Sequence, residues 1–513
     1  MTIEKSVKPV SLTKKASLNA LASTLDYGAR LVVGFITNPL LVSGLGDYSY
    51  GVWQILGRLI GYISPASGRP TQVLKWTVAN QQSSTDYDQK RRQVGSAIAV
   101  WLLFLPLMTL LGSLLAWFAP IWLKAPTNYY LSIRCAAALL VVNLVMVSLV
   151  HIPQAVLLGE NLGYKRMGLS ALLVFIGGGL TILALYFNTS IVGVAAATLT
   201  TTLLTGALFW QVTHAYVPWF GVAKPLYQAI RQFLGLSSWF LVWNLIVKLM
   251  RASDVVILGI LDSPELVTVY SITKYAPETV ISLVIIVVVG ICPGLGGIIG
   301  SGNLRKASQV RNEIMLFTWL LATILGSTIL LWNQSFLGLW VGSEYSVGSW
   351  ATLMIVVMVT QFVFIQNDAS IIDLTLNLRN KVLIGFLSAN LSIAIAAALV
   401  VYGQMGIVGL CLGFILGRLM LSLAYPWLIG RFLGISLLGQ FTSIFRPTLV
   451  ICCLFGLMLV LSQFLQVNNW LTLIFSVGIT LVIMSIVAFY LGLSGSQRQR
   501  IKERTQNLFP ALR

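Results

Sequence analysis

The stretch Val94–Phe118, VGSAIAVWLLFLPLMTLLGSLLAWF, decides the fold class of this protein. It holds no charged residue, and the basic residues Lys90, Arg91 and Arg92 come just before it. An α-helix rises 1.5 Å per residue, so this stretch would be about 37 Å long, enough to cross the ~30 Å hydrocarbon core of a membrane. Basic residues gather at the cytoplasmic ends of such helices. The stretch is therefore predicted to be a transmembrane helix that enters from the cytoplasm.

The rest of the chain has the same character. Hydrophobic types make up 57% of its 513 residues and charged types only 9%, whereas a soluble domain carries about 25% charged residues. This composition excludes a soluble enzyme, a nucleic-acid-binding module and a protein with a single membrane anchor. Nucleic acid is therefore not an expected partner, and the net charge of +18 is expected in cytoplasmic loops beside anionic membrane lipid.

Fourteen apolar segments of membrane-spanning length follow one another along the chain. They lie approximately at 17–42, 48–64, 94–118, 130–157, 168–187, 190–212, 233–260, 266–290, 312–332, 348–370, 382–402, 405–428, 447–466 and 469–492. If the N-terminus is cytoplasmic, 25 of the 33 Lys and Arg residues fall in inside segments, and Lys124 alone falls in an outside loop. By the positive-inside rule, both termini are predicted to be cytoplasmic.

The chain also shows a weak internal repeat at an offset of 216 residues. Asn161-Leu162-x-x-Lys165 aligns with Asn377-Leu378-x-x-Lys381, and Ile191-Val192-Gly193 aligns with Ile407-Val408-Gly409. Six helices per half would make the repeats parallel, with a substrate site between them. The predicted fold is an all-α polytopic membrane protein of about 14 transmembrane helices, with two six-helix lobes and two C-terminal helices. The predicted domains are 1–216, 217–432 and 433–513, and the linking segment 213–232 is predicted to be an amphipathic helix on the inner face.

Charged residues at membrane depth are the candidate functional residues. Each Lys or Arg at the bilayer centre costs about 2.5–3.5 kcal/mol on insertion scales, so these residues should face a wet cavity or a partner. Arg134, near the outer end of its segment, is expected to snorkel to the headgroups. The other basic residues are Arg30, Arg58, Lys248, Arg251, Lys274 and Arg418, and the acids are Asp26, Asp254 and Glu278.

The surplus of cations over acids suits an anionic ligand, because Arg binds phosphate through two hydrogen bonds. Arg58 and Arg251 are the preferred candidates for ligand contact. The i,i+4 pairs Asp26–Arg30 and Lys274–Glu278 could instead neutralise each other. No metal-ligand spacing, nucleophile motif or phosphate loop is present, and the five cysteines are interpreted as small apolar residues.

Several short motifs resemble a known family. They are Leu45-Gly46-Asp47-Tyr48-Ser49-Tyr50-Gly51-Val52-Trp53, Leu158-Gly159-Glu160-Asn161, Ile191-Val192-Gly193 and Gly342-Ser343-Glu344-Tyr345. In their order and spacing, the chain resembles the polysaccharide transporters of the multidrug/oligosaccharidyl-lipid/polysaccharide exporter superfamily, including the Wzx-type O-antigen flippases and the lipid II flippase.

This resemblance implies a V-shaped pair of lobes in the bacterial cytoplasmic (inner) membrane. It implies a flippase that moves an undecaprenyl-diphosphate-linked oligosaccharide to the outer leaflet by alternating access, with no enzymatic activity. The residues that would bind the diphosphate are Arg30, Arg58, Lys248, Arg251, Lys274 and Arg418. The segments 447–466 and 469–492 would form a groove for the lipid tail. The implied partners are the lipid-linked glycan, membrane lipid and other polysaccharide-assembly membrane proteins. No cofactor is expected beyond coupling to Na⁺ or H⁺, for which Asp26, Asp254 and Glu278 are the candidates.

Two other functions remain open at this point. A cation-coupled multidrug exporter of the same superfamily usually has twelve helices and a more acidic or apolar cavity. A membrane glycosyltransferase or O-antigen polymerase usually has a sizeable outer loop with polar catalytic residues, whereas the longest predicted outer loop here is about 333–347.

Overall fold

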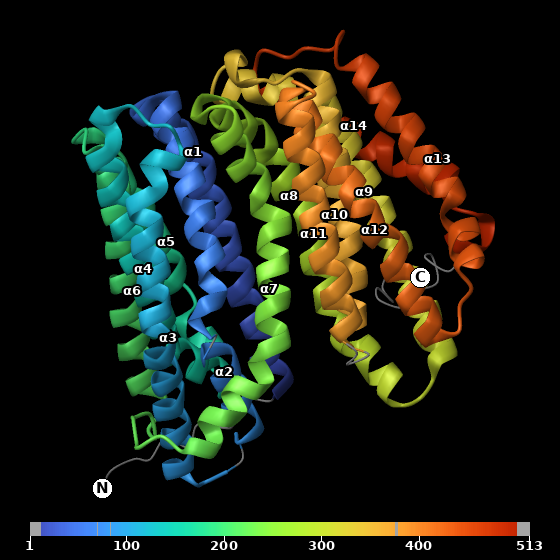
Figure 1. The fold of residues 1–513 in the computed structure, drawn as a ribbon. Coiled ribbons are helices and arrows are strands. Elements are labelled where there is room, and N and C mark those ends of the chain that lie inside the picture. Colours follow the sequence, from blue (N-terminus) through green and yellow to red (C-terminus); the bar gives the residue numbers. More distant parts are fainter. Residues whose placement is uncertain (1–11, 69, 83, 375–377, 500–513) are drawn as a thin grey trace, which may run out of the picture. The chain divides into compact units, whose positions relative to one another are not determined.

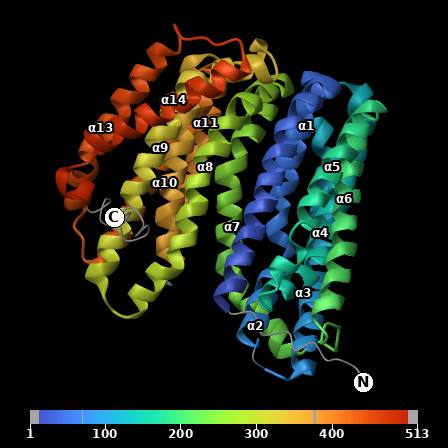
Figure 2. The same ribbon diagram turned by 180° about the vertical axis from the view of Figure 1, so that it is seen from behind.

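The structure is a computed structural model that describes residues 12–68, 70–82, 84–374 and 378–499. The long elements in these ranges are all α-helices (Figures 1 and 2). They are α1 (Leu12–Ile63), α2 (Pro70–Asn80), α3 (Tyr87–Trp122), α4 (Tyr130–Gly159), α5 (Leu169–Tyr186), α6 (Ser190–Tyr216), α7 (Tyr227–Leu261), α8 (Pro264–Gly300), α9 (Leu304–Trp340), α10 (Ser349–Asp373), α11 (Leu378–Val401), α12 (Gly406–Leu433), α13 (Leu437–Leu461) and α14 (Trp470–Val487). The short segments between them include the 3₁₀-helix η3 (Gly163–Arg166).

Twelve helices in the described ranges are long and apolar enough to cross a membrane. The protein is therefore an all-helical, multi-pass membrane protein. The first of these spans, Leu21–Ser67, covers most of the predicted segment 17–42 and all of the predicted segment 48–64. The predicted segment 233–260 lies within α7. The orientation of the termini stays a prediction.

The long element α1 consists of two helices joined at Gly46. This glycine has φ 75° and ψ 164°, outside the helical region. The hydroxyl of Tyr50 lies 3.5 Å from the amide oxygen of Asn38, although twelve residues of continuous helix would separate the two by about 18 Å. The chain therefore turns sharply at Gly46, which agrees with the predicted break between the first two segments.

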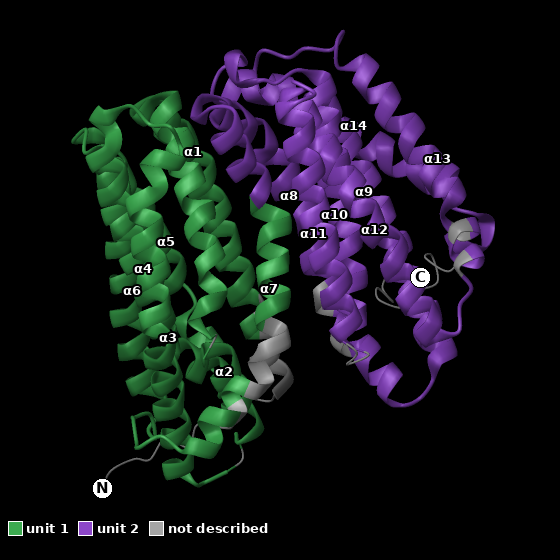
Figure 3. Ribbon diagram, viewed as in Figure 1, with its two compact units in different colours: residues 1–252 green, residues 253–513 purple. Residues whose placement is uncertain are grey.

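The chain divides into two compact units, residues 1–252 and 253–513 (Figure 3). The boundary falls inside α7. In the first unit, α4 packs against α3 and α6, and α5 packs against α1 and α6. In the second unit, α12 packs against α10 and α11, and α9 packs against α8, α13 and α14. The predicted repeat and its domain boundaries stay a prediction.

The link between the predicted segments 266–290 and 312–332 differs from a simple loop in the structure. Residues 291–311 are mostly helical, because α8 continues to Gly300 and α9 begins at Leu304. The turn between them has Gly302 at φ 76° and Asn303 as the N-cap of α9, whose side chain accepts a hydrogen bond from the backbone N–H of Lys306. The low polarity of 291–300 was compatible with a longer helix, but glycine at four of these positions favoured a loop.

The amphipathic helix predicted at 213–232 is wrong. The helix α6 ends at Tyr216, residues 217–226 are not helical, and α7 begins at Tyr227. Trp219 in this segment is only 5% exposed, and its indole N–H donates to the Glu160 carboxylate at 2.9 Å. Glu160 also forms a 2.9 Å ion pair with Lys90 at the start of α3. These contacts hold the segment against α3 and α4 without a helix.

Some residues used in the sequence predictions lie outside the described residues. Among the Lys and Arg residues predicted to be cytoplasmic these are Lys5, Lys8, Arg69, Arg500, Lys502, Arg504 and Arg513, and in the predicted repeat it is Asn377.

The turn at Gly46 yields a stability prediction. Its φ and ψ lie in a region that is essentially restricted to glycine, where other residues cost about 1–3 kcal/mol. We expect Gly46→Val to lower the thermal unfolding temperature of the detergent-purified protein. Gly28→Ala is the matched control on the same element, because its new methyl group would meet open space and alanine favours a helix. Equal unfolding temperatures for Gly46→Val and the wild type would contradict a strained turn.

Candidate functional site

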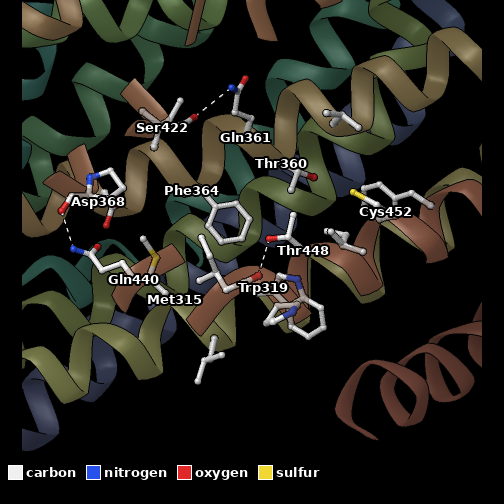
Figure 4. A pocket seen from close by; sticks show the side chains of 18 of the residues that line it. Met315, Trp319, Thr360, Gln361, Phe364, Asp368, Ser422, Gln440, Thr448 and Cys452 are labelled. Atoms are coloured by element: carbon white, nitrogen blue, oxygen red, sulfur yellow. Dashed lines mark hydrogen bonds between the residues drawn. The ribbon is translucent and has the colours of Figure 1, made fainter. Parts of the chain in front are cut away.

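The second unit contains an apolar pocket between α13 and the helices α9, α10 and α12. Its volume is about 660 Å³, within the range of small-molecule and cofactor sites. Trp319, Phe364 and Met315 are among its lining residues, and Figure 4 shows them with Cys452 from α13. Most of the lining is aliphatic or aromatic. The pocket is therefore suited to a hydrocarbon chain rather than to a charged group.

The pocket is long as well as apolar. Along α10 its lining runs from Trp350 to Asp368, which corresponds to about 27 Å of helix. Along α13 it runs from Gln440 to Leu459, a similar length. Both lengths approach the ~30 Å thickness of the hydrocarbon core. The pocket is thus longer than one lipid leaflet.

One end of the pocket is polar but electrically neutral. The guanidinium of Arg311 lies 3.0 Å from the Asp368 carboxylate and donates at 2.8 Å to the side-chain oxygen of Gln440. Arg311 and Asp368 are each 4% exposed. Further along, the amide of Gln361 donates to the hydroxyl of Ser422 at 3.3 Å (Figure 4). A paired arginine of this kind attracts an anion much less than an unpaired one does.

This pocket differs from the groove that the family resemblance implied. That groove was placed between the segments 447–466 and 469–492. The observed lining comes from α13 together with α9, α10 and α12, and from Gln497 beyond α14. In the structure α13 and α14 both pack against α9; α13 forms one wall of the pocket, and α9, α10 and α12 form the others.

A buried ion network occupies the core of the second unit. The carboxylate of Asp254 accepts hydrogen bonds from the ammonium of Lys274, from the Tyr270 hydroxyl at 2.6 Å and from the backbone N–H of Val255 at 2.8 Å. Lys274 also lies 3.4 Å from Glu278, so the predicted i,i+4 pair is confirmed. Asp254 is 1% exposed and Lys274 5%. Both residues are thus engaged within the protein.

Arg418 belongs to the same region. It is 3% exposed, and its guanidinium stacks on the rings of Phe414 and Phe362 at 4.9 and 5.5 Å. Its charge is close enough to Asp254 for the two to attract each other. Two cations, Lys274 and Arg418, therefore face two acids, Asp254 and Glu278. Both cations are thus buried inside the second unit, and their predicted role in diphosphate binding stays a prediction.

In the first unit, Asp26 does not pair with Arg30 as the i,i+4 spacing suggested. Its carboxylate lies 3.1 Å from the guanidinium of Arg166, in the 3₁₀-helix η3 between α4 and α5. Burial lowers the pKa of Arg166; the Asp26 carboxylate opposes this effect, and the positive charge of Arg30 adds to it. Arg30 itself is exposed. The i,i+4 pairing of Asp26 with Arg30 was not found because η3 packs against α1 and brings the guanidinium of Arg166 to Asp26.

The other predicted cations of the first unit are accessible. Arg251 is exposed, and Arg58 and Lys248 are half-buried. The guanidinium of Arg134 lies 4.0 Å from the ring of Trp117, and its snorkelling toward the headgroups stays a prediction. The accessible cations Arg30, Arg58, Lys248 and Arg251 all belong to residues 1–252.

Sequence analysis missed several charged groups of these sites, including Arg311, Asp368 and Arg166. Asp368 lies inside the predicted segment 348–370, so it is a fourth acid at membrane depth, and its position alone could have identified it. Arg166 was counted as an ordinary loop residue, yet it is 9% exposed, and only the packing of η3 reveals this. Within the described ranges, no cluster of three or more His, Cys, Asp or Glu residues is arranged to hold a metal ion.

Comparison with known proteins identifies the fold but no relative by sequence. No protein-family model matches the chain, and no curated protein matches it significantly. The lipid II flippase MurJ, in an inward closed conformation, matches with a TM-score of 0.63 and 12% identity over 92% of this chain and 99% of MurJ. An inward-facing multidrug resistance transporter of the MATE family, in the MOP superfamily, matches with a TM-score of 0.62 and 14% identity over 83% of this chain and 98% of the transporter.

This chain has the fold of the MOP superfamily transporters. A further neighbour, a MOP superfamily transporter from Pyrococcus furiosus, matches with a TM-score of 0.56 and 14% identity over 84% of this chain and 99% of its own. These structural neighbours are transporters, not enzymes. The narrower likeness to O-antigen flippases stays a prediction.

The ion network around Asp254 yields a stability prediction. We expect Lys274→Met to destabilise the protein by about 3–5 kcal/mol, because it removes one partner of a buried ion pair and leaves Asp254 under-compensated. The double variant Lys274→Met/Asp254→Asn should recover part of this loss. Thermal unfolding in detergent measures both effects. A stable Lys274→Met variant would show that the network does not hold the unit together.

Proposed function

We propose that the protein is a flippase that moves an undecaprenyl-diphosphate-linked oligosaccharide from the cytoplasmic to the outer leaflet by alternating access. Its product would serve the assembly of cell-surface polysaccharide such as the O-antigen of lipopolysaccharide. The observation that carries this proposal is the long apolar pocket beside α13, in a chain with the fold of a superfamily that includes the lipid II flippase MurJ.

The dimensions of the pocket favour a polyprenyl tail over an ordinary acyl chain. One acyl chain of a phospholipid covers a single leaflet, about half of the ~30 Å hydrocarbon core. The pocket lining extends over about 27 Å along α10. A chain longer than one leaflet would use this whole length. A small cationic drug would leave most of it empty.

The diphosphate would bind away from this pocket. Asp368 neutralises Arg311 at the polar end, so the pocket offers little attraction for a diphosphate. The candidates for the diphosphate are the cations of the first unit with accessible side chains, Arg30, Arg58, Lys248 and Arg251. Arginine side chains at membrane depth that can reach water suit phosphate oxygens.

The remaining parts of the proposal follow from this function. The protein would lie in the bacterial cytoplasmic (inner) membrane with both termini inside, beside other polysaccharide-assembly membrane proteins. Coupling to Na⁺ or H⁺ would involve Asp26, Asp254 or Glu278. Of these, Glu278 is the least enclosed, since its side chain is 22% exposed, against 2% for Asp254 and 11% for Asp26.

A cation-coupled multidrug exporter is the second candidate. It is favoured by the MATE family neighbours, whose identity to this chain is as low as that of MurJ. The match to MurJ covers more of this chain, 92% against 83% for the MATE transporter above. The two functions differ in whether the pocket beside α13 must be open for transport.

The first test concerns the cations. We expect Arg58→Ala and Arg251→Ala each to abolish delivery of the lipid-linked glycan to the outer leaflet, because each removes a charge for the diphosphate. Both variants should still insert in the membrane. Delivery is measured by the accessibility of the glycan to a membrane-impermeant lectin. Normal delivery in both variants would overturn the diphosphate assignment.

The second test blocks the pocket. Gly456 on α13 lines the pocket and has open space around an added Cβ, so Gly456→Trp should fill the pocket without disturbing the helix. We expect glycan delivery to fall about ten-fold or more, a loss of about 1.4 kcal/mol of lipid-tail binding or greater. Gly478→Trp on α14, which also has open space, is the matched control and should keep normal delivery. Normal delivery by Gly456→Trp would argue against a lipid tail in this pocket, and drug efflux by the same variant would favour the exporter.

A further inference from the structure

The loop between α4 and α5 brings a buried arginine to α1. Arg166, in η3, belongs to a basic loop, yet only 9% of it is exposed. Its guanidinium contacts Asp26 at 3.1 Å and donates to the hydroxyl of Ser170 at 3.1 Å. It also lies over the ring of Phe209 at 5.6 Å. Three different elements therefore fix the position of this charge.

The surroundings of Arg166 carry more positive than negative charge. Arg30 lies one turn beyond Asp26 on the same helix, close enough for its charge to act on Arg166. The ring of His151 on α4 lies 6.2 Å from that of Phe209, the same ring over which Arg166 lies. Asp26 is the acid that contacts this group. The Asp26–Arg166 pair thus has a second guanidinium one helical turn away and an imidazole on the far side of Phe209.

Hydrogen-bonding capacity is also unused at this place. In the described part of the chain, the Nε of Arg166 and the Oδ1 of Asp26 are buried without a hydrogen-bond partner. A buried polar group left unpaired costs about 1–3 kcal/mol. Asp26 is 8% exposed, so its free oxygen is not simply turned to the surface. The Asp26–Arg166 pair therefore leaves hydrogen-bonding groups unused. A stronger acceptor than the Asp26 carboxylate could replace it at the guanidinium of Arg166.

We infer that Arg166 and Arg30, with His151 beside them, form a phosphate-binding site in the first unit, and that Asp26 occupies Arg166 while the site is empty. This inference rests on the proposed function and adds Arg166 and His151 to the residues that receive the diphosphate. A phosphate group offers several anionic oxygens, which accept from two guanidinium groups at once better than one carboxylate does.

The experiment measures binding of inorganic pyrophosphate and of undecaprenyl diphosphate to the full-length protein purified in detergent, by isothermal titration calorimetry. The variants are Arg166→Gln, Arg30→Gln and Asp26→Asn. The matched control is Lys165→Gln, since Lys165 is adjacent in sequence but its ammonium lies over the ring of Tyr216 at 4.3 Å. The two ligands separate a site for phosphate itself from one that needs the lipid.

We expect Arg166→Gln and Arg30→Gln each to weaken binding of both ligands about ten-fold, the loss of one charge-assisted interaction. Asp26→Asn should tighten pyrophosphate binding several-fold, because it removes the competing carboxylate. A purely structural role for Asp26 would leave binding unchanged or weaken it. This variant therefore keeps the test decisive if Arg166→Gln does not fold. Lys165→Gln should bind both ligands normally.

The inference fails if Arg166→Gln folds and binds both ligands as the wild type does, or if Asp26→Asn does not tighten binding. The proposed function would survive that result as long as the wild type binds undecaprenyl diphosphate. If the wild type binds neither ligand, the proposed function fails together with the inference. Binding of pyrophosphate that is equally strong in Arg166→Gln and Arg30→Gln would place the phosphate site elsewhere.

Discussion

Hydrocarbon does not solvate charge, and this constraint governs where the polar residues of this protein can lie. A charge within a span must pair with another charge, stack on an aromatic ring or reach water. The second unit meets the constraint by pairing: Asp254 holds Lys274, and Arg418 stacks on Phe414. The first unit leaves Arg30 and Arg251 accessible. The same solvation cost thus favours the paired network in the second unit. For the accessible cations of the first unit, it supports the proposed contact with an anionic ligand.

The two units consequently differ in the chemistry that they offer. The second unit has a neutral ion network and an apolar pocket, both suited to a region that meets hydrocarbon. The first unit has accessible basic side chains and the incompletely satisfied pair Asp26–Arg166. A lipid-linked glycan combines an apolar tail with an anionic head, so its two parts need different surroundings. The proposed placement of tail and head in different units rests on these surroundings and not on any single residue.

The fold was predictable because uncharged runs such as Val94–Phe118 leave few alternatives to a membrane helix. The turn at Gly46 was predictable for the same reason, since glycine and aspartate interrupt two apolar runs there. Tertiary contacts were harder to predict. The i,i+4 rule identified Lys274–Glu278 correctly but missed Arg166, which reaches Asp26 across 140 residues of sequence. The helix at 213–232 was wrong because hydrophobic residues such as Trp219 serve to anchor a loop in the core. Local spacing predicts local partners, whereas a loop that folds back onto a distant helix can be seen only in three dimensions.

The single-residue turn at Gly46 has a consequence for the biogenesis of the protein. The two helices on either side of it are joined by this one non-helical residue, with no loop long enough to be translocated separately. The insertion machinery would therefore release them into the bilayer together, as a helical hairpin. In that arrangement the polar side chains Asp26 and Arg58 would enter the membrane shielded by a neighbouring helix from the outset, rather than being exposed one at a time to lipid.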